Sequence, residues 1–234
     1  MTLSKRAEHL TELMDDPECD PVKLRRTLER FKYVNRIVAG WASIYRSRIR
    51  PEFAAAQGPV RLLDIGCGAG DVLRRMVFMA RRDGFSIEGI GIDPDTRALE
   101  VARAAKPVDG VSYQLATSTR LAAAGERFDA VISNHLLHHL DTGSLAQVIR
   151  DTEQLTTRIA VHSDIERGWT AYGLYAAGIL PLAPGTFLRT DGLLSIRRSF
   201  TAEELESAVP RGWRIHRGGP FRLLAVLRRG GETS

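Results

Sequence analysis

Cysteine, lysine and long apolar runs are all scarce in this sequence, and each shortage excludes a class of protein. The two cysteines in 234 residues, Cys19 and Cys67, are too few to build a disulfide framework or a zinc site by themselves. Only four of the 33 basic residues are lysines, and a net charge of +5 carried by arginine is weak evidence for a nucleic-acid partner. The N-terminal stretch "MTLSKRAEHL" has no apolar signal-peptide region. We therefore expect a protein of the reducing cytoplasm.

The apolar runs are too short to cross a membrane. The longest nearly uncharged stretch, residues 168–188, contains two prolines and four glycines. Its continuous apolar part falls short of the ~20 residues that span a bilayer. We interpret it as a covered or substrate-facing segment. Internal repeats and low-complexity tracts are also absent. The composition, 44% hydrophobic and 26% charged, is ordinary for a soluble globular protein, and 234 residues are enough for one α/β domain with a full core.

The chain begins with helical patterns and then changes to alternating strands and helices. Apolar residues spaced three or four apart predict helices over 2–15 and 21–48. Beyond residue 59, short apolar runs predict strands at 60–65, 87–93, 111–116, 128–134 and 158–165. Amphipathic segments between them predict helices at 71–82, 94–105 and 142–155. This alternation indicates βαβ units and a parallel sheet that helices cover on both faces.

The C-terminal part ends the alternation. A helix at 201–209 is followed by two apolar runs, 213–219 and 221–229, that are almost adjacent. Strands joined so tightly must be antiparallel, because a parallel crossover needs a dozen or more residues. We therefore expect a parallel sheet that finishes with an antiparallel strand, which is not the usual ending of a dehydrogenase.

A glycine-rich turn, "RLLDIGCGAGD" (61–71), follows the first strand. It lacks the Gly-Lys-Ser/Thr of a P-loop, and its glycines, Gly66, Gly68 and Gly70, are spaced G-x-G-x-G in place of the dinucleotide pattern G-x-G-x-x-G. Asp64 at the strand end would repel a pyrophosphate and attract a cationic ligand. The turn therefore favours S-adenosylmethionine over NAD, which argues against a nicotinamide oxidoreductase. Asp93, at the end of the second strand, supports a ribose without choosing between the two cofactors.

Three segments, "LLDIGCGAGD", "GIDPD" and "FDAVISNHLLHHL", together resemble class I S-adenosylmethionine-dependent methyltransferases, in particular the small-molecule kind related to quinone-biosynthesis enzymes. The resemblance covers about residues 58–165. It implies an α/β, Rossmann-like fold with a seven-stranded, mostly parallel sheet and an antiparallel last strand. With the predicted N-terminal helices, we expect two parts of the chain: a helical cap, 1–50, and a methyltransferase domain, 51–234. The domain would contain a substrate-cover insert at about 166–198.

The resemblance also implies a set of cofactor contacts. They are Asp64, Gly66, Cys67, Gly68, Gly70, Asp93, Pro94, Thr117, Ser118, Asn134 and His135. Cys67 would lie beside the cofactor as a small side chain, and the backbone at Asn134 and His135 would approach the methionine moiety. Thr117 and Ser118 stand where the family often has an acid or an amide near the adenine, so this chain departs from the pattern there.

Candidate catalytic and substrate residues follow the fourth and fifth strands. His139, ahead of His138, is a candidate base for an acceptor hydroxyl, although a histidine at a helix start is often structural. Asp164 lies at the carboxyl end of a strand, where α/β folds place ligand-facing residues, and we expect it either to contact the substrate or to cap the segment that follows. Trp169, Tyr172 and Tyr175 form an aromatic face on the insert. Core packing is the alternative, but we favour a pocket for a flat, apolar acceptor.

The predicted activity is methyl transfer to a hydroxyl of a small aromatic or polyketide-like molecule, with C-methylation of a phenolic or quinol ring as the close alternative. A nucleic-acid methyltransferase is disfavoured, because the chain has no N-P-P-Y tetrad and no aromatic-interleaved basic stripe. An intact glycine turn with both carboxylates argues against a non-catalytic scaffold. The N-terminal helices would serve as a lid or as a homodimer contact, which the sequence leaves open.

Overall fold

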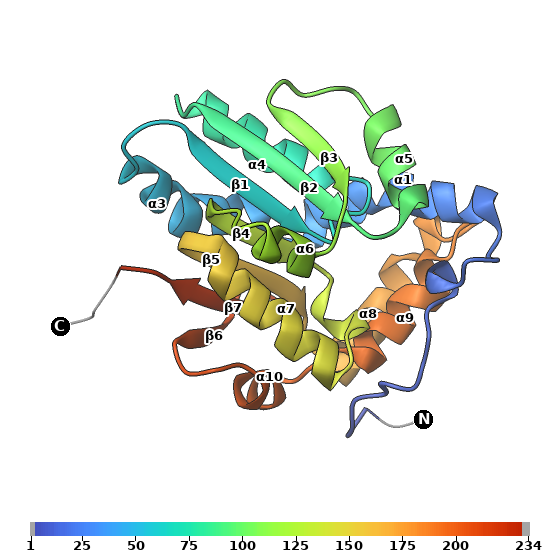
Figure 1. Cartoon of the computed structure of the whole chain (residues 1–234). Helices are drawn as coiled ribbons and strands as arrows, with labels where there is room; N and C mark the ends of the chain where they lie inside the picture. The colour runs from blue at the N-terminus through green and yellow to red at the C-terminus, as the bar shows by residue number, and fades with distance from the viewer. Residues whose placement is uncertain (1–2, 231–234) are drawn as a thin grey trace.

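One sheet of seven strands crosses the middle of the molecule in the computed structural model, which describes residues 3–230 apart from the side chains of Ile37 and Val38 (Figure 1). Its order is β3-β2-β1-β4-β5-β7-β6. The strands are β1 (Val60–Ile65), β2 (Ile87–Asp93), β3 (Val111–Leu115), β4 (Phe128–Asn134), β5 (Thr156–Ile165), β6 (Trp213–Arg217) and β7 (Arg222–Arg228). The ends of the chain, residues 1–2 and 231–234, lie outside the described residues.

The sheet has the predicted mixture of strand directions. Strands β1 to β5 pair in parallel, and β7 is antiparallel to both β5 and β6. The predicted antiparallel ending is therefore confirmed. The carboxyl ends of the parallel strands meet at one edge of the sheet. Strand β1 is the middle one of the five parallel strands, and its Asp64 lies opposite Gly91 of β2 and Ile132 of β4.

Helices connect the strands as the sequence periodicity predicts. Helix α4 has the bounds predicted for it, 71–82, whereas the short α6 was not predicted. The helices from β1 onward are α4 (Asp71–Arg82), α5 (Thr96–Ala104), α6 (Ser118–Ala123), α7 (Thr142–Leu155), α8 (Trp169–Gly178), α9 (Leu188–Arg198) and α10 (Ala202–Ala208). Helices α8 and α9 occupy the segment predicted to be an insert.

The helix predicted over 21–48 is interrupted. Its first part is α1 (Pro21–Val38), and Gly40 then adopts a left-handed conformation, φ 63°, that breaks the helix. The chain resumes as three short helical pieces: α2 (Trp41–Ile44), a π-helical turn (Tyr45–Ile49) and α3 (Arg50–Ala54). The glycine changes the chain direction, so that α1 lies near α5 while the later pieces pack on the sheet.

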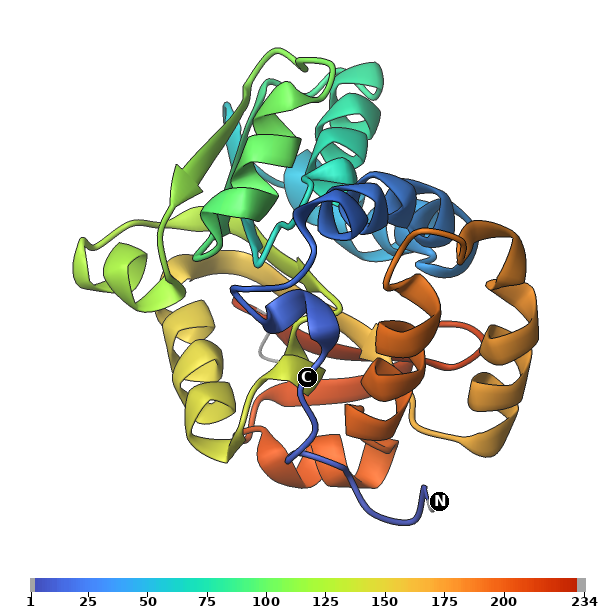
Figure 2. The ribbon, with the colours of Figure 1, turned by 90° about the vertical axis from the view of Figure 1, so that its right-hand side faces the viewer.

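The prediction of a helix over 2–15 is wrong for the described residues. Residues 3–20, here called the N-terminal strap, contain a single 3₁₀ turn, η1 (Leu13–Asp15). Strap backbone groups bond to other elements in place of a helix of their own: the N–H groups of Leu13 and Met14 donate to Asp191 of α9, at 3.1 and 3.0 Å. In Figure 2 the strap runs in blue across the molecule, between the loop after β4 and α9.

Two apolar layers sandwich the sheet. On one face, Trp41, Tyr45 and Phe53 of the N-terminal pieces pack with α4, and on the other face α6, α7 and α10 form the cover. Consecutive β1 residues serve opposite layers, because Leu62 points to the first and Leu63 to the second. No helix among the described residues has the length and apolar character that crossing a bilayer requires.

Candidate active site

The glycine turn between β1 and α4 depends on conformations that glycine adopts without strain. Gly66, Gly68 and Gly70 have φ values of 66°, 52° and 69°. A side chain at Gly70 would also collide with Tyr113, whose Oη lies 2.3 Å from the position of an added Cβ. The N–H groups of Gly66 and Cys67 donate to Ile92 O of β2, at 2.9 and 3.0 Å. The turn is therefore fastened to the neighbouring strand.

Asp64 presents an unsatisfied carboxylate beside this turn. Its side chain is 1% exposed, and Oδ1 has no hydrogen-bond partner among the described residues. Burial, together with the charges of Asp71 and Asp93, raises the pKa of Asp64 well above its usual range. A buried, unpaired carboxylate is costly unless a positive group joins it. The residues here therefore fit a ligand that brings a cation, as the ammonium of S-adenosylmethionine does.

Asp93 at the end of β2 holds the turn in place. Its Oδ2 accepts from the N–H of Gly68 and its Oδ1 from the N–H of Asp95, both at 2.9 Å. Burial raises the pKa of Asp93 in spite of these two bonds. Each carboxylate oxygen keeps a further lone pair, so Asp93 can also accept from ribose hydroxyls. The adjacent Pro94 is exposed.

Asn134 and His135 follow β4 and belong to a polar network that the sequence did not reveal. Asn134 Oδ1 accepts from Trp41 Nε1 at 3.0 Å and from Arg222 at 2.8 Å, and its Nδ2 donates to Asn35 at 3.2 Å. His135 has a left-handed φ of 57°, which is uncommon for a residue other than glycine. Burial and the nearby Arg222 lower the pKa of His135 well below its usual range, so the ring is neutral.

His138 and its neighbour lie in η3 (Leu137–His139), the turn after β4. His138 is 1% exposed, and its Nδ1 lies 2.6 Å from Asp164, which also accepts from the His138 backbone N–H at 2.9 Å. Burial acts to lower the pKa of His138, but Asp164 and Glu12 raise it to about 9. Asp164 is itself 2% exposed. Its carboxylate is therefore already paired inside the protein, and its contact with the substrate stays a prediction.

The two hydroxyls predicted near the adenine differ in availability. Thr117 is exposed, and its Oγ1 accepts from the N–H of Arg120 as the cap of α6. Ser118 is buried, and its hydroxyl donates to Asp151 at 2.7 Å. Of the two, Thr117 is the one that faces solvent.

The predicted aromatic face divides between two environments. Trp169 is exposed and makes an edge-on contact with Tyr172, with ring centroids 6.1 Å apart. Tyr175 instead donates from its hydroxyl to Leu188 O at 2.7 Å, which ties α8 to α9. The structure thus brings Trp169 and Tyr172 together and assigns Tyr175 to packing between helices.

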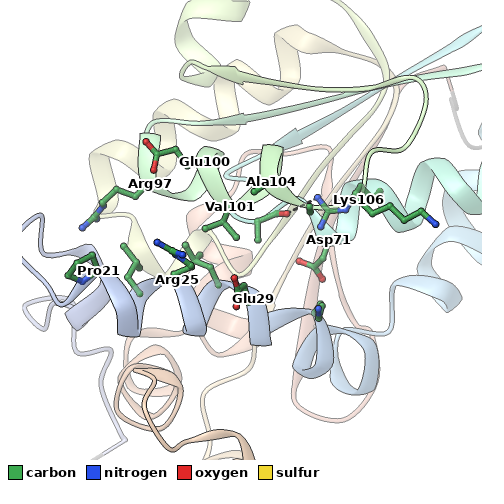
Figure 3. Close-up of a pocket in the computed structure, with 15 residues that line it drawn as sticks. Pro21, Arg25, Glu29, Asp71, Arg97, Glu100, Val101, Ala104 and Lys106 are labelled. Carbon is green, nitrogen blue, oxygen red and sulfur yellow. Dashed lines mark hydrogen bonds between the residues drawn. The ribbon is translucent and has the colours of Figure 1, made fainter.

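A groove of about 560 Å³ lies on the outer side of the turn, between α1 and α5 (Figure 3). The basic residues Arg25, Lys32 and Lys106 line it together with the apolar residues Leu28 and Val101. The predicted cofactor residues form no part of this lining, which reaches the turn through Ala69 and Asp71. The groove is therefore distinct from the position of the Asp64 and Asp93 carboxylates.

Several residues of this region could not be found from the sequence. Trp41, Asn35 and Arg222 contact the end of β4 from elements far away in the chain. Glu12, in the strap, is 3% exposed and faces His138. A single sequence holds no signal for such long-range contacts, because each joins residues whose neighbours in the chain say nothing about the partner.

Comparisons with known proteins agree with this geometry. A family described as "Methyltransferase domain" matches residues 62–158. The ubiquinone biosynthesis O-methyltransferase of Brucella anthropi is 31% identical over 158 residues, which are 65% of this chain and 59% of that protein. The protein of the same name from Cereibacter sphaeroides is 37% identical over 83 residues, 35% of this chain and 31% of its own length. The chain thus spans less than two thirds of these relatives.

Solved structures share the fold at low sequence identity. The plantazolicin methyltransferase BpumL, in complex with SAH, aligns with a TM-score of 0.55 and 13% identity over 88% of this chain and 95% of its own. Human N-acetylserotonin methyltransferase, in complex with SAM, aligns with a TM-score of 0.60 and 12% identity over 89% of this chain and 56% of its own. Residues 62–158 thus match a methyltransferase domain, and the sheet order, the glycine turn and these similarities support a class I S-adenosylmethionine-dependent methyltransferase.

Proposed function

We propose that this chain transfers the methyl group of S-adenosylmethionine to a hydroxyl oxygen of a small aromatic or polyketide-like molecule in the cytoplasm. The observation that carries the proposal is the buried Asp64 carboxylate with its unpartnered Oδ1. The curated relatives, which are named ubiquinone biosynthesis O-methyltransferases, support the choice of oxygen as the acceptor atom.

The carboxylates beside the turn have complementary roles in binding. S-adenosylmethionine supplies, when bound, a methyl group on a positively charged sulfur. Asp64 would accept from its ammonium group, which offsets the cost of burying an unpaired charge. Asp93 would accept from the ribose hydroxyls with the lone pairs that Gly68 and Asp95 leave free. Three left-handed glycines keep the turn free of side chains at this point.

Methyl transfer places few chemical demands on the protein. The step joins an acceptor oxygen to the methyl carbon as the carbon–sulfur bond breaks with its electron pair on sulfur, and the hydroxyl proton passes to a base. In-line alignment supplies most of the rate enhancement. A base role for His139 or His138 stays a prediction. His139 is the better candidate, because its side chain is 24% exposed whereas that of His138 is 1% exposed.

We also propose that α8 and α9, in residues 166–198, cover the acceptor. Large apolar side chains on this segment face solvent: Trp169 is 59% exposed, Leu174 60% and Leu180 51%. An apolar, aromatic acceptor would bury such surface, and each Å² removed from water would favour binding by about 25 cal/mol. Tyr172 extends this surface through its edge contact with Trp169.

A product assay tests the proposal. The purified chain is incubated with S-adenosylmethionine and a panel of phenols, catechols and aliphatic alcohols, and products are identified by mass spectrometry and NMR. We expect methyl ethers of phenolic hydroxyls, formed by the protein and by its Asp109→Asn control but not by Asp64→Asn. Asp109 is a suitable control because its side chain is 92% exposed.

Other products would contradict the proposal in distinct ways. A methyl group on a ring carbon would replace oxygen by carbon as the acceptor atom. Cofactor binding without any methylated product across the panel would favour a binding protein.

A further inference from the structure

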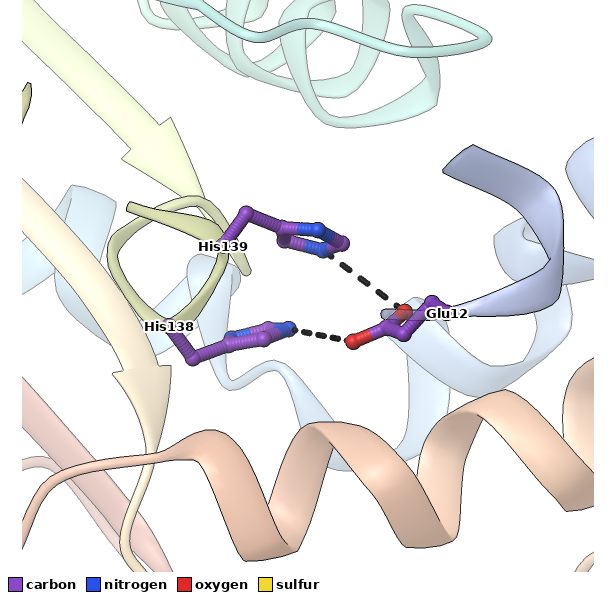
Figure 4. Close-up of side chains that lie close together, drawn as sticks. All are labelled: Glu12, His138 and His139. Carbon is purple, nitrogen blue, oxygen red and sulfur yellow. Dashed lines mark ion pairs between the residues drawn. The ribbon is translucent and has the colours of Figure 1, made fainter. Parts of the chain in front are cut away.

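Two adjacent histidines meet a glutamate from the far end of the chain (Figure 4). His138 Nε2 lies 3.4 Å from Glu12 Oε1, and His139 Nε2 lies 3.7 Å from Glu12 Oε2. One ligand atom from each of the three side chains lies within 4.8 Å of the others. The histidines come from η3 and the glutamate from the N-terminal strap, so the cluster joins two elements that are far apart in sequence.

The outer nitrogen of each histidine is held by a carboxylate. His138 Nδ1 pairs with Asp164 at 2.6 Å, and His139 Nδ1 pairs with Asp15 at 3.1 Å. Ionised carboxylates only accept hydrogen bonds, so each Nδ1 carries the proton and, in the neutral ring, each Nε2 presents a lone pair toward Glu12. A carboxylate that orients a histidine in this way is the usual partner of metal-bound histidine. The arrangement occurs here twice, side by side.

The inner nitrogen of His138 has no hydrogen bond. It is fully buried, and it is among the few buried polar side-chain atoms of the described residues without such a partner. Ser195 fixes the oxygen opposite, because its hydroxyl donates to Glu12 Oε1 at 2.9 Å. This nitrogen faces an anchored carboxylate oxygen 3.4 Å away, and the position between them, which a proton fills in the metal-free protein, is one that a metal ion can take.

The charges around the cluster also favour a cation. Glu12, Asp15 and Asp164 contribute three carboxylates, against which Arg198 sets one guanidinium, 3.7 Å from Glu12 and 3.4 Å from Asp15. The ion pairs of the cluster thus join three carboxylates and one guanidinium to the two imidazoles, and no lysine of the described part of the chain takes part in them. A cation bound here would lie among more carboxylates than guanidinium groups.

We propose that Glu12, His138 and His139 bind a divalent transition-metal ion of the zinc type. Ligand atoms about 2.0–2.2 Å from zinc lie about 3.3–3.6 Å apart at tetrahedral angles, and the two nitrogen–oxygen distances, 3.4 Å to Oε1 and 3.7 Å to Oε2 of Glu12, are close to that separation. Two imidazoles and one carboxylate are a set that zinc accepts, with a fourth position left for water. A second grouping, which includes His135, is unsuitable because Arg222 lies 3.2 Å from His135 Nε2 and opposes a cation.

The ion would fasten the strap over the edge of the sheet where the cofactor residues lie. It would make the two histidines ligands in place of free bases. The proposal does not depend on methyl transfer, and its test uses no methyl donor, so either proposal can fail while the other stands.

The test uses the full chain after treatment with a chelator. Calorimetric titration with Zn²⁺ is expected to show one site, and Zn²⁺ is expected to raise Tm. Co²⁺ in place of Zn²⁺ should give the intense visible absorption of a four-coordinate site. His139→Gln should weaken Zn²⁺ binding at least tenfold, and Asp15→Asn by about 10–100-fold through the orientation of His139. His9→Gln is the matched control, since His9 is an exposed histidine of the same strap.

Circular dichroism of each variant shows that it is folded, and Glu12→Gln serves as the second ligand variant if His139→Gln does not fold. Absence of a heat signal and of any Tm shift with both ions would overturn the proposal and leave a protonated ion-pair cluster. Equal Zn²⁺ affinity in the His139→Gln, Glu12→Gln and His9→Gln variants would overturn it as well, because the ion would then bind elsewhere.

Discussion

Replacing Asp164 by asparagine distinguishes a structural carboxylate from a substrate ligand. Asp164 accepts from His138 Nδ1 at 2.6 Å, from the His138 N–H at 2.9 Å and from the Ile165 N–H at 2.7 Å, and it is 2% exposed. Burial acts against the ionised form, yet His138 holds the pKa of Asp164 well below its usual range. The amide of an asparagine in this position would turn an N–H toward these donors.

The size of the effect follows from the burial of the pair. Breaking a buried ion pair by removing one partner costs about 3–5 kcal/mol, because the other charge is left without compensation. We therefore expect Asp164→Asn to lower the free energy of unfolding by about that amount. Urea unfolding at pH 7.5, followed by tryptophan fluorescence, measures it.

Asp109→Asn is the matched control. Asp109 pairs with Arg81 at 2.9 Å, but its side chain is 92% exposed, and such surface pairs contribute at most about 1 kcal/mol. Equal stability of the two variants, with a raised KM for the acceptor in Asp164→Asn alone, would refute the structural role and return Asp164 to the substrate.

Two further predictions concern the core. Burial lowers the pKa of His162 to about 4, so the stability that its neutral ring contributes is present above about pH 6.5 and is lost as pH falls toward 4. The loss is on the order of 3 kcal/mol. Urea unfolding between pH 7 and 4 should show a smaller loss of stability in His162→Gln than in the unaltered protein, and identical pH profiles of the two proteins would contradict this. Gly89→Ala should lower the free energy of unfolding by about 1–3 kcal/mol, because the added Cβ would lie 2.6 Å from Val77. In Gly173→Ala of α8 the added Cβ meets no atom within 4 Å, so the free energy of unfolding should be unchanged or higher by up to about 1 kcal/mol. The reverse order of the two Tm values would count against the packing of β2 on α4.

The strands and the glycine turn could be predicted because their signals are local. The short apolar run of β1 and the helical period of α4 involve only neighbouring residues. The close spacing of the last two apolar runs requires antiparallel strands, and β6 and β7 pair in that direction. The positions of Asp64 and Asp93 followed from the strands that carry them.

The strap could not be predicted, since its structure comes from distant partners. Its pattern suits a helix, but the Leu13 and Met14 N–H groups bond to Asp191, and Glu12 faces His138. Intrinsic helix propensity is a weak preference, and such tertiary contacts override it. The role of Arg222 could not be predicted for the same reason, because this first residue of β7 contacts Asn134 at the end of β4.

Calorimetric titration with S-adenosylmethionine, S-adenosylhomocysteine and NAD, on the unaltered chain and on Asp64→Ala, tests the central claim most directly. The account predicts micromolar binding of the sulfonium cofactor or its product, no binding of NAD, and at least a tenfold loss of affinity in the variant, because a hydrogen bond to a charged group contributes about 1.5–3 kcal/mol. Clear NAD binding with none of either sulfur nucleoside would contradict it, and so would equal affinity in the two proteins.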